Sequence, residues 1–349
     1  MSLREYLVAE GAPADVIDAA ESQGSEALRL LAVDYLLLGA PAYTSTQIAK
    51  LAGIDEDTAR RYWRALGFAD VPDDEVVFTD LDLAALKGAL MLTEAGFAKP
   101  EVNLQIARVM GHAMSKIADA QVSSIGSRIE QSAQEHGGTA DEISEAIVND
   151  TSRLVPINES FLSYMYRRHL AAAAKRTVAG EGSEETGLTL TVGFADMVGF
   201  TAITRRLEDQ ELEALVERFE TISYDTIGSL GGRLVKMIGD EVMFVAEQAR
   251  VAADIAITLA ERCAADEILP GLRIGLAHGP LIRRAGDYYG PTVNLANRLA
   301  GLVSLEPVLV SWSVRDALRE EPAFSIKRSR NRHLKGLGRT SVYSLRRAW

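Results

Sequence analysis

The sequence is poor in cysteine, in long apolar runs and in positive charge. Cys263 is the single cysteine among 349 residues, so no intramolecular disulfide can form. Its apolar, helical surroundings indicate a buried thiol rather than a nucleophile. No basic segment followed by an apolar one opens the chain, and the most apolar early run, residues 28–38, is short and interrupted by Asp34. We therefore expect a cytoplasmic protein without a transmembrane segment or a disulfide framework.

The shortage of positive charge leaves a formal net charge of -12. Proteins that bind nucleic acids usually carry a basic face or stripe, so a general polyanion-binding role is disfavoured. A nucleoside triphosphate that brings its own metal ions remains compatible with this charge. Zinc is not indicated, because His278 and His333 lie far apart in the second half and have no cysteine partners. The length and the 47% hydrophobic content predict two globular domains with sizeable cores.

The first half of the chain has helical periodicity almost throughout, which predicts an all-α domain at residues 1–175. Within it, Tyr43–Arg64 has the pattern of a helix, a turn at Gly53 and a second helix, shaped like a helix-turn-helix. The expected helix caps are Thr44 or Ser45 and Asp55.

This segment could bind DNA through its second helix, but that helix opens with three acidic residues at 55–57, which would face phosphates. Only Arg60, Arg61 and Arg64 oppose them. A packing module is therefore favoured over a DNA-binding one.

A change of composition divides the chain. Residues 171–187 pass from helix-forming alanines to small, polar and glycine residues, and 176–187 is the predicted linker. After the linker, strands and helices alternate, which predicts an α/β domain at 188–349 built on one sheet. The expected elements are a strand at 188–194, a helix at about 207–228, a hairpin at 233–247, a helix at about 249–265, a strand at 272–278, a helix at 294–302 and an extended segment at 308–311.

Two short turns in this domain each place an aspartate at the end of an apolar strand. Asp196 follows the alternating run 188–194 and precedes Gly199, which permits a tight turn into a helix. Asp240 lies at the tip of the hairpin, because strand-like segments flank the turn signal Gly239-Asp240. Two hard oxygen ligands can thus meet above adjacent strands, as a two-metal nucleotide site requires.

A third run, Gly286–Arg298, supplies a turn followed by a helix. Asn294 and Arg298 are four residues apart on that helix and therefore share one face. An amide and a guanidinium are expected to project side by side. Tyr288, Tyr289 and Asn297 fit helix-surface or packing roles, and we assign them no chemistry.

In this order, the three runs resemble the signature segments of class III nucleotidyl cyclases over about Leu188–Tyr343. With its helical first half, the chain is similar to soluble actinobacterial-type adenylate cyclases that carry an N-terminal regulatory domain. The resemblance implies a ferredoxin-like α+β catalytic domain, within the broad α/β class, behind an all-α regulatory domain. It also implies a head-to-tail homodimer in which both protomers complete each active site.

The resemblance assigns roles by motif position. Asp196, Asp240 and Met197 would bind two Mg²⁺ or Mn²⁺ ions per active site. Asn294 would orient the ribose, and Arg298 would neutralise charge on the transferring α-phosphoryl group. Lys236 and Asp287 would contact the adenine base. The main chain from Met197 to Thr201, which includes Phe200 and Thr201, would contact the phosphates. Lys335 of a closing loop would contact the triphosphate.

The implied activity is conversion of ATP into 3′,5′-cyclic AMP and pyrophosphate, regulated by the N-terminal domain. Two alternatives stay open: a guanylyl cyclase, which Lys236 and Asp287 disfavour, and a DNA-binding regulator with a cyclase-like nucleotide-sensing domain. The regulatory input could be a small molecule or lipid enclosed by the apolar, Met-containing helices, or pH. The histidines available for pH sensing are His112, His136 and His169. The segment 149–175 could instead be an inert helix that only aids dimerisation.

Overall fold

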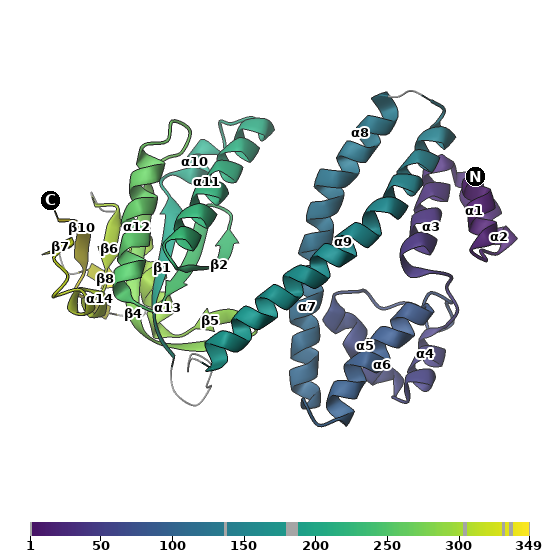
Figure 1. Ribbon diagram of the computed structural model, residues 1–349, viewed down its shortest axis with the longest axis horizontal. Helices are drawn as coiled ribbons and strands as arrows, with labels where there is room; N and C mark the ends of the chain where they lie inside the picture. Colours follow the sequence, from purple (N-terminus) through teal and green to yellow (C-terminus); the bar gives the residue numbers. More distant parts are fainter. Residues whose placement is uncertain are drawn as a thin grey trace. The chain divides into compact units, whose positions relative to one another are not determined.

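The computed structural model describes residues 2–135, 138–178, 188–302, 306–329, 332–334 and 338–348. The chain divides into two compact units, Met1–Ala172 and Ala173–Trp349. Figure 1 shows the helical unit in purple to teal and the mixed unit in green to yellow. Most of the predicted linker, residues 179–187, lies outside the described residues, as does His136. No helix in the described ranges is both long and apolar enough to cross a membrane.

The N-terminal unit is helical, as its periodicity predicts, and its only β pairing among described residues is a single bridge between Tyr43 and Phe78. Its helices are α1 (Leu3–Ala9), α2 (Ala14–Gln23), α3 (Ser25–Leu38), α4 (Ser45–Ala52), α5 (Glu56–Leu66), α6 (Asp80–Glu94), α7 (Pro100–Gln121), α8 (Ser127–Glu135) and α9 (Ala140–Arg176), with the π-helical turn η1 (Val122–Gly126) before α8.

Helices α4 and α5 form the expected helix-turn-helix shape. Thr44 and Asp55 cap them through side-chain oxygens, and Gly53 ends α4 in the left-handed conformation that glycine allows. Two of the arginines on α5 are already in ion pairs, Arg60 with Asp73 at 2.6 Å and Arg64 with Asp70 at 2.7 Å. Their charge is balanced within the unit, which argues against the DNA-binding alternative.

The C-terminal unit is a mixed sheet with helices on both faces. Its elements are β1 (Leu188–Met197), α10 (Phe200–Ile203), α11 (Asp209–Ser229), β2 (Arg233–Ile238), β3 (Glu241–Ala246), α12 (Ala249–Ala264), β4 (Leu272–Arg284), β5 (Asp287–Tyr289), α13 (Pro291–Ala300), β6 (Val308–Val310), α14 (Trp312–Ala317), β7 (Phe324–Arg328), β8 (Arg332–Leu334), β9 (Gly338–Thr340) and β10 (Tyr343–Arg347).

The described strands of the main sheet run in the order β2-β3-β1-β4-β6-β10-β7, and β5 pairs with β4. Strands β1 to β4, with α11 and α12 as the two crossovers, form a βαββαβ unit whose neighbouring strands are antiparallel. This is the ferredoxin-like core that the family resemblance implied. The two-stranded sheet β8-β9 is separate from it.

The two faces of the sheet carry separate apolar cores. One face packs on α11 and α12, which lie side by side in Figure 1, and it buries Ala195, Met197 and Cys263. Cys263 is buried, as predicted, and burial raises the pKa of its thiol to about 11. The opposite face buries Val192 and Phe194 beneath α13. Because side chains alternate along a strand, Asp196 belongs to the α13 face.

Candidate active site

Three charged side chains stand in a row across the α13 face. Asp196 on β1 is paired in register with Glu241 on β3 and with Arg273 on β4. Directly opposed residues of antiparallel strands lie on the same face of the sheet, so the three side chains are neighbours. The Arg273 guanidinium donates a hydrogen bond to the Asp196 carboxylate.

The two aspartates predicted from the sequence meet here. The amide of Met197 donates to the carbonyl oxygen of Asp240 at 3.2 Å, which holds the hairpin tip beside the end of β1. Burial raises the pKa of Asp196, Arg273 lowers it, and the nearby Asp240 carboxylate raises it again. The carboxylates of Asp196 and Asp240 therefore repel each other, and Arg273 partly offsets that repulsion.

Glu241 adds a third acidic group that the sequence alone did not single out. Burial, followed by the charges of Asp196 and Asp240, raises its pKa to about 7. Its carboxylate turns toward α13, where Oε1 accepts a hydrogen bond from Nδ2 of Asn297 at 3.0 Å. The signal that could have identified Glu241 and Arg273 is the strand register, since both stand opposite Asp196.

Lys236 and Asp287, which the family resemblance assigns to the adenine base, form an ion pair between β2 and β5. A β-bulge on β2 helps to aim the lysine. Leu234 pairs with Phe244 and Lys236 with Met243, so Val235 is an extra residue in its strand. Both Val235 and Met243 contact the core beneath α13, which puts Lys236 on the same face as Asp196.

Helix α13 carries the predicted amide and guanidinium. It follows Gly290 (φ 131°) and has Pro291 at its first position, where the missing amide hydrogen costs nothing. Asn294 and Arg298 are both exposed, on the same side of the helix. The helix approaches β4 so closely that a Cβ atom on Gly275 would lie 2.2 Å from the carbonyl oxygen of Ala296.

The segment after Asp196 offers fewer free amides than expected. Met197 donates to Asp240, and Val198 donates to the carbonyl oxygen of Gly271 at 2.9 Å. These two amides are therefore not open to a phosphate, which corrects part of the expected contact from Met197 to Thr201. Phe200 and Thr201 form the first turn of α10 after Gly199. Lys335 lies outside the described residues.

The donor set suits hard cations. No group of three or more His, Cys, Asp or Glu side chains within the described ranges is arranged to hold a metal ion by itself. Mg²⁺ is usually held by one or two carboxylates together with substrate phosphates rather than by an all-protein cage. Asp196 and Asp240 provide such a partial, oxygen-only set, so the residues fit a cation that is completed by a nucleotide.

Comparisons with known proteins give matches to both units of the chain. The family profile described as "Adenylate and Guanylate cyclase catalytic domain" matches residues 184–347, and the profile "Adenylate cyclase regulatory domain" matches residues 1–173. An adenylate cyclase of Streptomyces coelicolor is 42% identical over 298 residues, covering 84% of this chain and 77% of the relative. The chain belongs to the adenylate cyclase family. The resemblance read from the three motifs is thereby confirmed.

Two other relatives are also similar to this cyclase over most of its length. An adenylate cyclase of Streptomyces griseus is 41% identical over 280 residues, which are 80% of this chain and 69% of that protein. A "pH-sensitive adenylate cyclase" of Mycobacterium tuberculosis is 30% identical over 357 residues, covering 99% of this chain and 87% of that protein.

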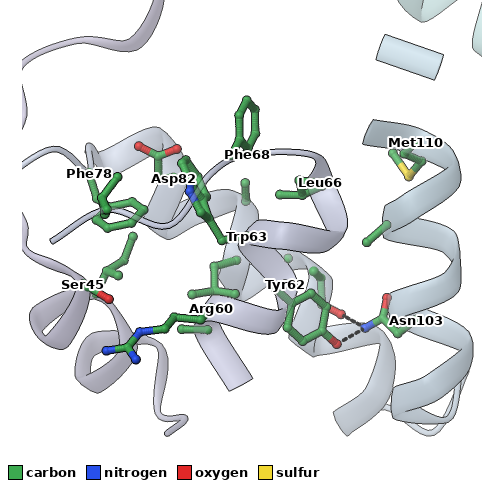
Figure 2. A pocket seen from close by; sticks show the side chains of 18 of the residues that line it. Ser45, Arg60, Tyr62, Trp63, Leu66, Phe68, Phe78, Asp82, Asn103 and Met110 are labelled. Atoms are coloured by element: carbon green, nitrogen blue, oxygen red, sulfur yellow. Dashed lines mark hydrogen bonds between the residues drawn. The ribbon is translucent and has the colours of Figure 1, made fainter. Parts of the chain in front are cut away.

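The N-terminal unit of the cyclase contains an apolar cavity of about 480 Å³ between α4, α5, α6 and α7. Figure 2 shows Trp63, Phe68, Phe78 and Met110 among the side chains that line it. At one end, the buried Asn103 donates to the hydroxyl of Tyr62 at 3.0 Å and to a backbone carbonyl of α6, as the dashed lines in Figure 2 show. These polar groups satisfy each other, so the cavity wall is suited to an apolar molecule.

Proposed function

We propose that this cyclase converts ATP into 3′,5′-cyclic AMP and pyrophosphate. The observation that carries the proposal is the convergence of Asp196 and Asp240 on the sheet face that also holds the Lys236–Asp287 pair and α13. A carboxylate pair, a base-sized donor and acceptor, and an exposed guanidinium are the groups that such a cyclisation uses.

The metal-binding part of the proposal assigns two Mg²⁺ or Mn²⁺ ions to Asp196, Asp240 and the main chain at Met197. Bound cations would increase the acidity of the ribose 3′-hydroxyl and offset charge on the triphosphate. Arg273 holds the Asp196 carboxylate in place until the nucleotide arrives. Because Arg273 also lowers the pKa of Asp196, it helps to keep that carboxylate ionised and able to bind a cation.

The adenine base would bind at Lys236 and Asp287. The ammonium can donate to a ring nitrogen and the carboxylate can accept from the exocyclic amine, which favours adenine over guanine. Since each group now satisfies the other, bound adenine would exchange one set of hydrogen bonds for another. This exchange favours a base that offers both an acceptor and a donor.

The rest of the nucleotide would contact three elements. Asn294 on α13 would orient the ribose, and Arg298 would stabilise the charge that grows on the α-phosphoryl group. The first turn of α10, with Phe200 and Thr201, and Lys335 would contact the phosphates. Positioning and electrostatics would then supply most of the rate enhancement.

We further propose that the active sites form between two copies of the chain. Asn294 and Arg298 are exposed within one copy. Large apolar side chains beside the site are exposed as well: Ile238 (56%) before the hairpin turn, and Ile282 (65%) and Tyr289 (51%), which pair with each other between β4 and β5. A second copy that covered this surface would bury apolar area and complete the sites.

The decisive assay measures cyclic nucleotide formed from ATP and from GTP with Mn²⁺. Wild type should form cyclic AMP preferentially, and Asp240→Ala should lose at least about 100-fold in rate. Asp225→Ala, which removes an exposed aspartate from α11, is the matched control and should stay active. Full activity of Asp240→Ala would overturn the assignment of the site, and a preference for GTP would favour the guanylyl cyclase alternative.

Mixing two inactive variants tests the shared sites. Asp240→Ala and Arg298→Ala each damage a different half-site, so a mixed dimer would contain one intact site and one doubly damaged site. Mixing should therefore restore up to about a quarter of wild-type activity, because half of the dimers in a random mixture are mixed. Absence of any recovery, with dimers present by analytical ultracentrifugation, would contradict composite sites.

The cavity supports a second proposal: a small apolar molecule or lipid regulates the enzyme from the N-terminal unit. Dodecanol is a simple probe, and it should change the rate and raise the Tm of the full chain. Gly88 lines the cavity and has open space where its side chain would lie, so Gly88→Leu should fill the cavity and abolish both effects. Gly126→Leu, outside the cavity, should respond like wild type.

A further inference from the structure

We propose that the hydrogen bond between Glu241 and Asn297 is a positioning contact that sets α13 relative to the metal-binding hairpin. The inference rests on the proposed composite sites, because it concerns how the hairpin and α13 of one chain, which would serve different sites, are held relative to each other. Glu241 and Asn297 are positioning residues in this scheme, and neither is assigned a contact with substrate or metal.

The bond connects two elements beside the residues that are proposed to act in the active site. Glu241 follows Asp240 directly and begins β3, and Asn297 lies immediately before Arg298 on α13. Nδ2 of Asn297 donates to Oε1 of Glu241 at 3.0 Å, and both residues are half-buried. A shift of α13 along or around its axis would therefore move Arg298 relative to Asp240 of the same chain.

In its first turn, α13 also donates a hydrogen bond from Oγ1 of Thr292 to the carbonyl oxygen of Pro280 on β4 at 2.8 Å. The apolar contacts of its later turns fix the distance of the helix from the sheet more than its rotation. The helix packs on β4 and β1, where Gly275 and Ala296 allow a very close approach. Apolar packing of this kind is non-directional, whereas a hydrogen bond weakens steeply when its geometry is lost. The Glu241–Asn297 bond is thus the directional contact from the hairpin to this helix.

The homodimer proposed above gives the bond a second consequence. If the carboxylates of one copy and the α13 residues of the other complete each site, then Asp240 and Arg298 of one chain serve different active sites. The bond would then fix the position of Asp240, which serves one site, relative to Arg298 of the same chain, which serves the other. Its loss should impair the chemical step in both sites at once.

The expected effect is on kcat rather than on KM. A displacement of about 1 Å at reacting groups can cost about 100-fold in rate, so a smaller shift after Asn297→Ala should lower kcat by about 10-fold. The KM for Mn²⁺–ATP should stay within about twofold, because the substitution leaves the proposed base contacts in place. A purely structural role would lower Tm without this selective loss of kcat.

The test uses the full chain and four variants: Asn297→Ala, Glu241→Ala, the double variant, and Glu241→Gln, which keeps an acceptor oxygen at the same place. Thr226→Val is the matched control. It removes another side-chain hydrogen bond of the same unit, from Nη1 of Arg262 to Thr226 at 2.8 Å, on the α11–α12 side. It should lower Tm and leave kcat unchanged.

The inference predicts that both alanine variants lose about 10-fold in kcat, that the double variant loses no more than either, and that Glu241→Gln keeps at least half of the wild-type kcat. The inference is overturned if the kcat of Asn297→Ala stays within twofold of the wild-type kcat. It is also overturned if the two losses in kcat multiply in the double variant. Should Asn297→Ala fail to fold, the comparison of Glu241→Gln with Glu241→Ala decides, and equal losses reject the inference. Failure of the proposed site would instead appear as an active Asp240→Ala enzyme.

Discussion

Lys236 and Asp287, 51 positions apart in sequence, meet as an ion pair at the edge of the α13 face. Neither partner is deeply buried, with side chains 37% and 26% exposed. An ion pair this accessible adds little to stability, since water solvates both charges well. Under the proposed function, the pair holds a donor and an acceptor ready for the adenine base.

Replacing Lys236 by alanine should weaken ATP binding. A hydrogen bond to a charged group is worth about 1.5–3 kcal/mol, so we expect the KM for Mn²⁺–ATP to rise by about 10-fold or more. Steady-state kinetics with ATP and GTP measure this effect together with the selectivity between the two. Lys327→Ala, which removes an exposed lysine of β7, provides the control. An unchanged KM and unchanged selectivity would remove Lys236 from the base site.

Replacing Arg298 by alanine should act on the chemical step. A donor aimed at charge that develops in the transition state is typically worth about 100- to 1000-fold in kcat, with a smaller effect on KM. Single-turnover measurements at saturating Mn²⁺–ATP separate the two. Arg315→Ala on α14 removes a partly exposed arginine elsewhere in the unit and should be neutral. A large rise in KM at constant kcat would show a role in ground-state binding instead.

Glu241 should make stability depend on pH. Its pKa in the folded protein is about 7, above the ordinary 4.5, so the folded state binds this proton more tightly than the unfolded state. Wild type should therefore lose stability relative to Glu241→Gln as the pH rises from about 4.5 to about 7, and the difference should level off above that range. Tm measured from pH 5 to pH 8 with a chelator present tests this.

Glu217→Gln, an exposed change on α11, is the control for that series and should follow wild type at every pH. If the Tm curves of Glu241→Gln and wild type are parallel, the Glu241 carboxyl titrates alike in the folded and unfolded states.

Adding a methyl group at Gly275 should disturb α13. The new Cβ would lie 2.2 Å from the carbonyl oxygen of Ala296 and 2.4 Å from the amide nitrogen of Ala300, and backbone atoms cannot move aside cheaply. Overpacking of this kind costs about 1–3 kcal/mol of unfolding free energy, and activity should fall as well. Gly228→Ala on α11 meets no atom within 4 Å and should be neutral or stabilising by up to about 1 kcal/mol. Equal stability of the two variants would contradict the close packing of α13.

The sequence predicted the alternating strands and helices of the catalytic unit because each of these elements has a local signal, and the family resemblance added the ferredoxin-like topology. Alternating apolar residues marked β1, Gly239-Asp240 marked the hairpin, and the spacing of Asn294 and Arg298 marked a helical face. Such patterns depend on neighbours within a few residues, so they survive without knowledge of the fold. The observed strands are longer than expected, with β1 reaching Met197 and β4 reaching Arg284.

What the sequence could not predict depends on contacts between distant segments. Arg273 and Glu241 are single charged residues on strands, and only the register opposite Asp196 gives them a place in the site. Asn297 was interpreted as a surface or packing residue because its partner lies on another element. The sequence pattern predicts a turn where β5 lies and gives no signal for β7 to β10, which pair with strands distant in the sequence or are only three residues long.

The two residues between Lys236 and the hairpin turn fix the side of the sheet on which the lysine lies. Because side chains alternate along a strand, deleting one of them would pair Lys236 with Val242 and turn it to the opposite face, whereas deleting the extra residue Val235 would leave Lys236 opposite Met243. Insertions in surface loops carry no such consequence, so natural length variation should avoid this strand and concentrate elsewhere. In an alignment of related cyclases, a gap placed within residues 237–238 would therefore signal a misalignment or a different base preference.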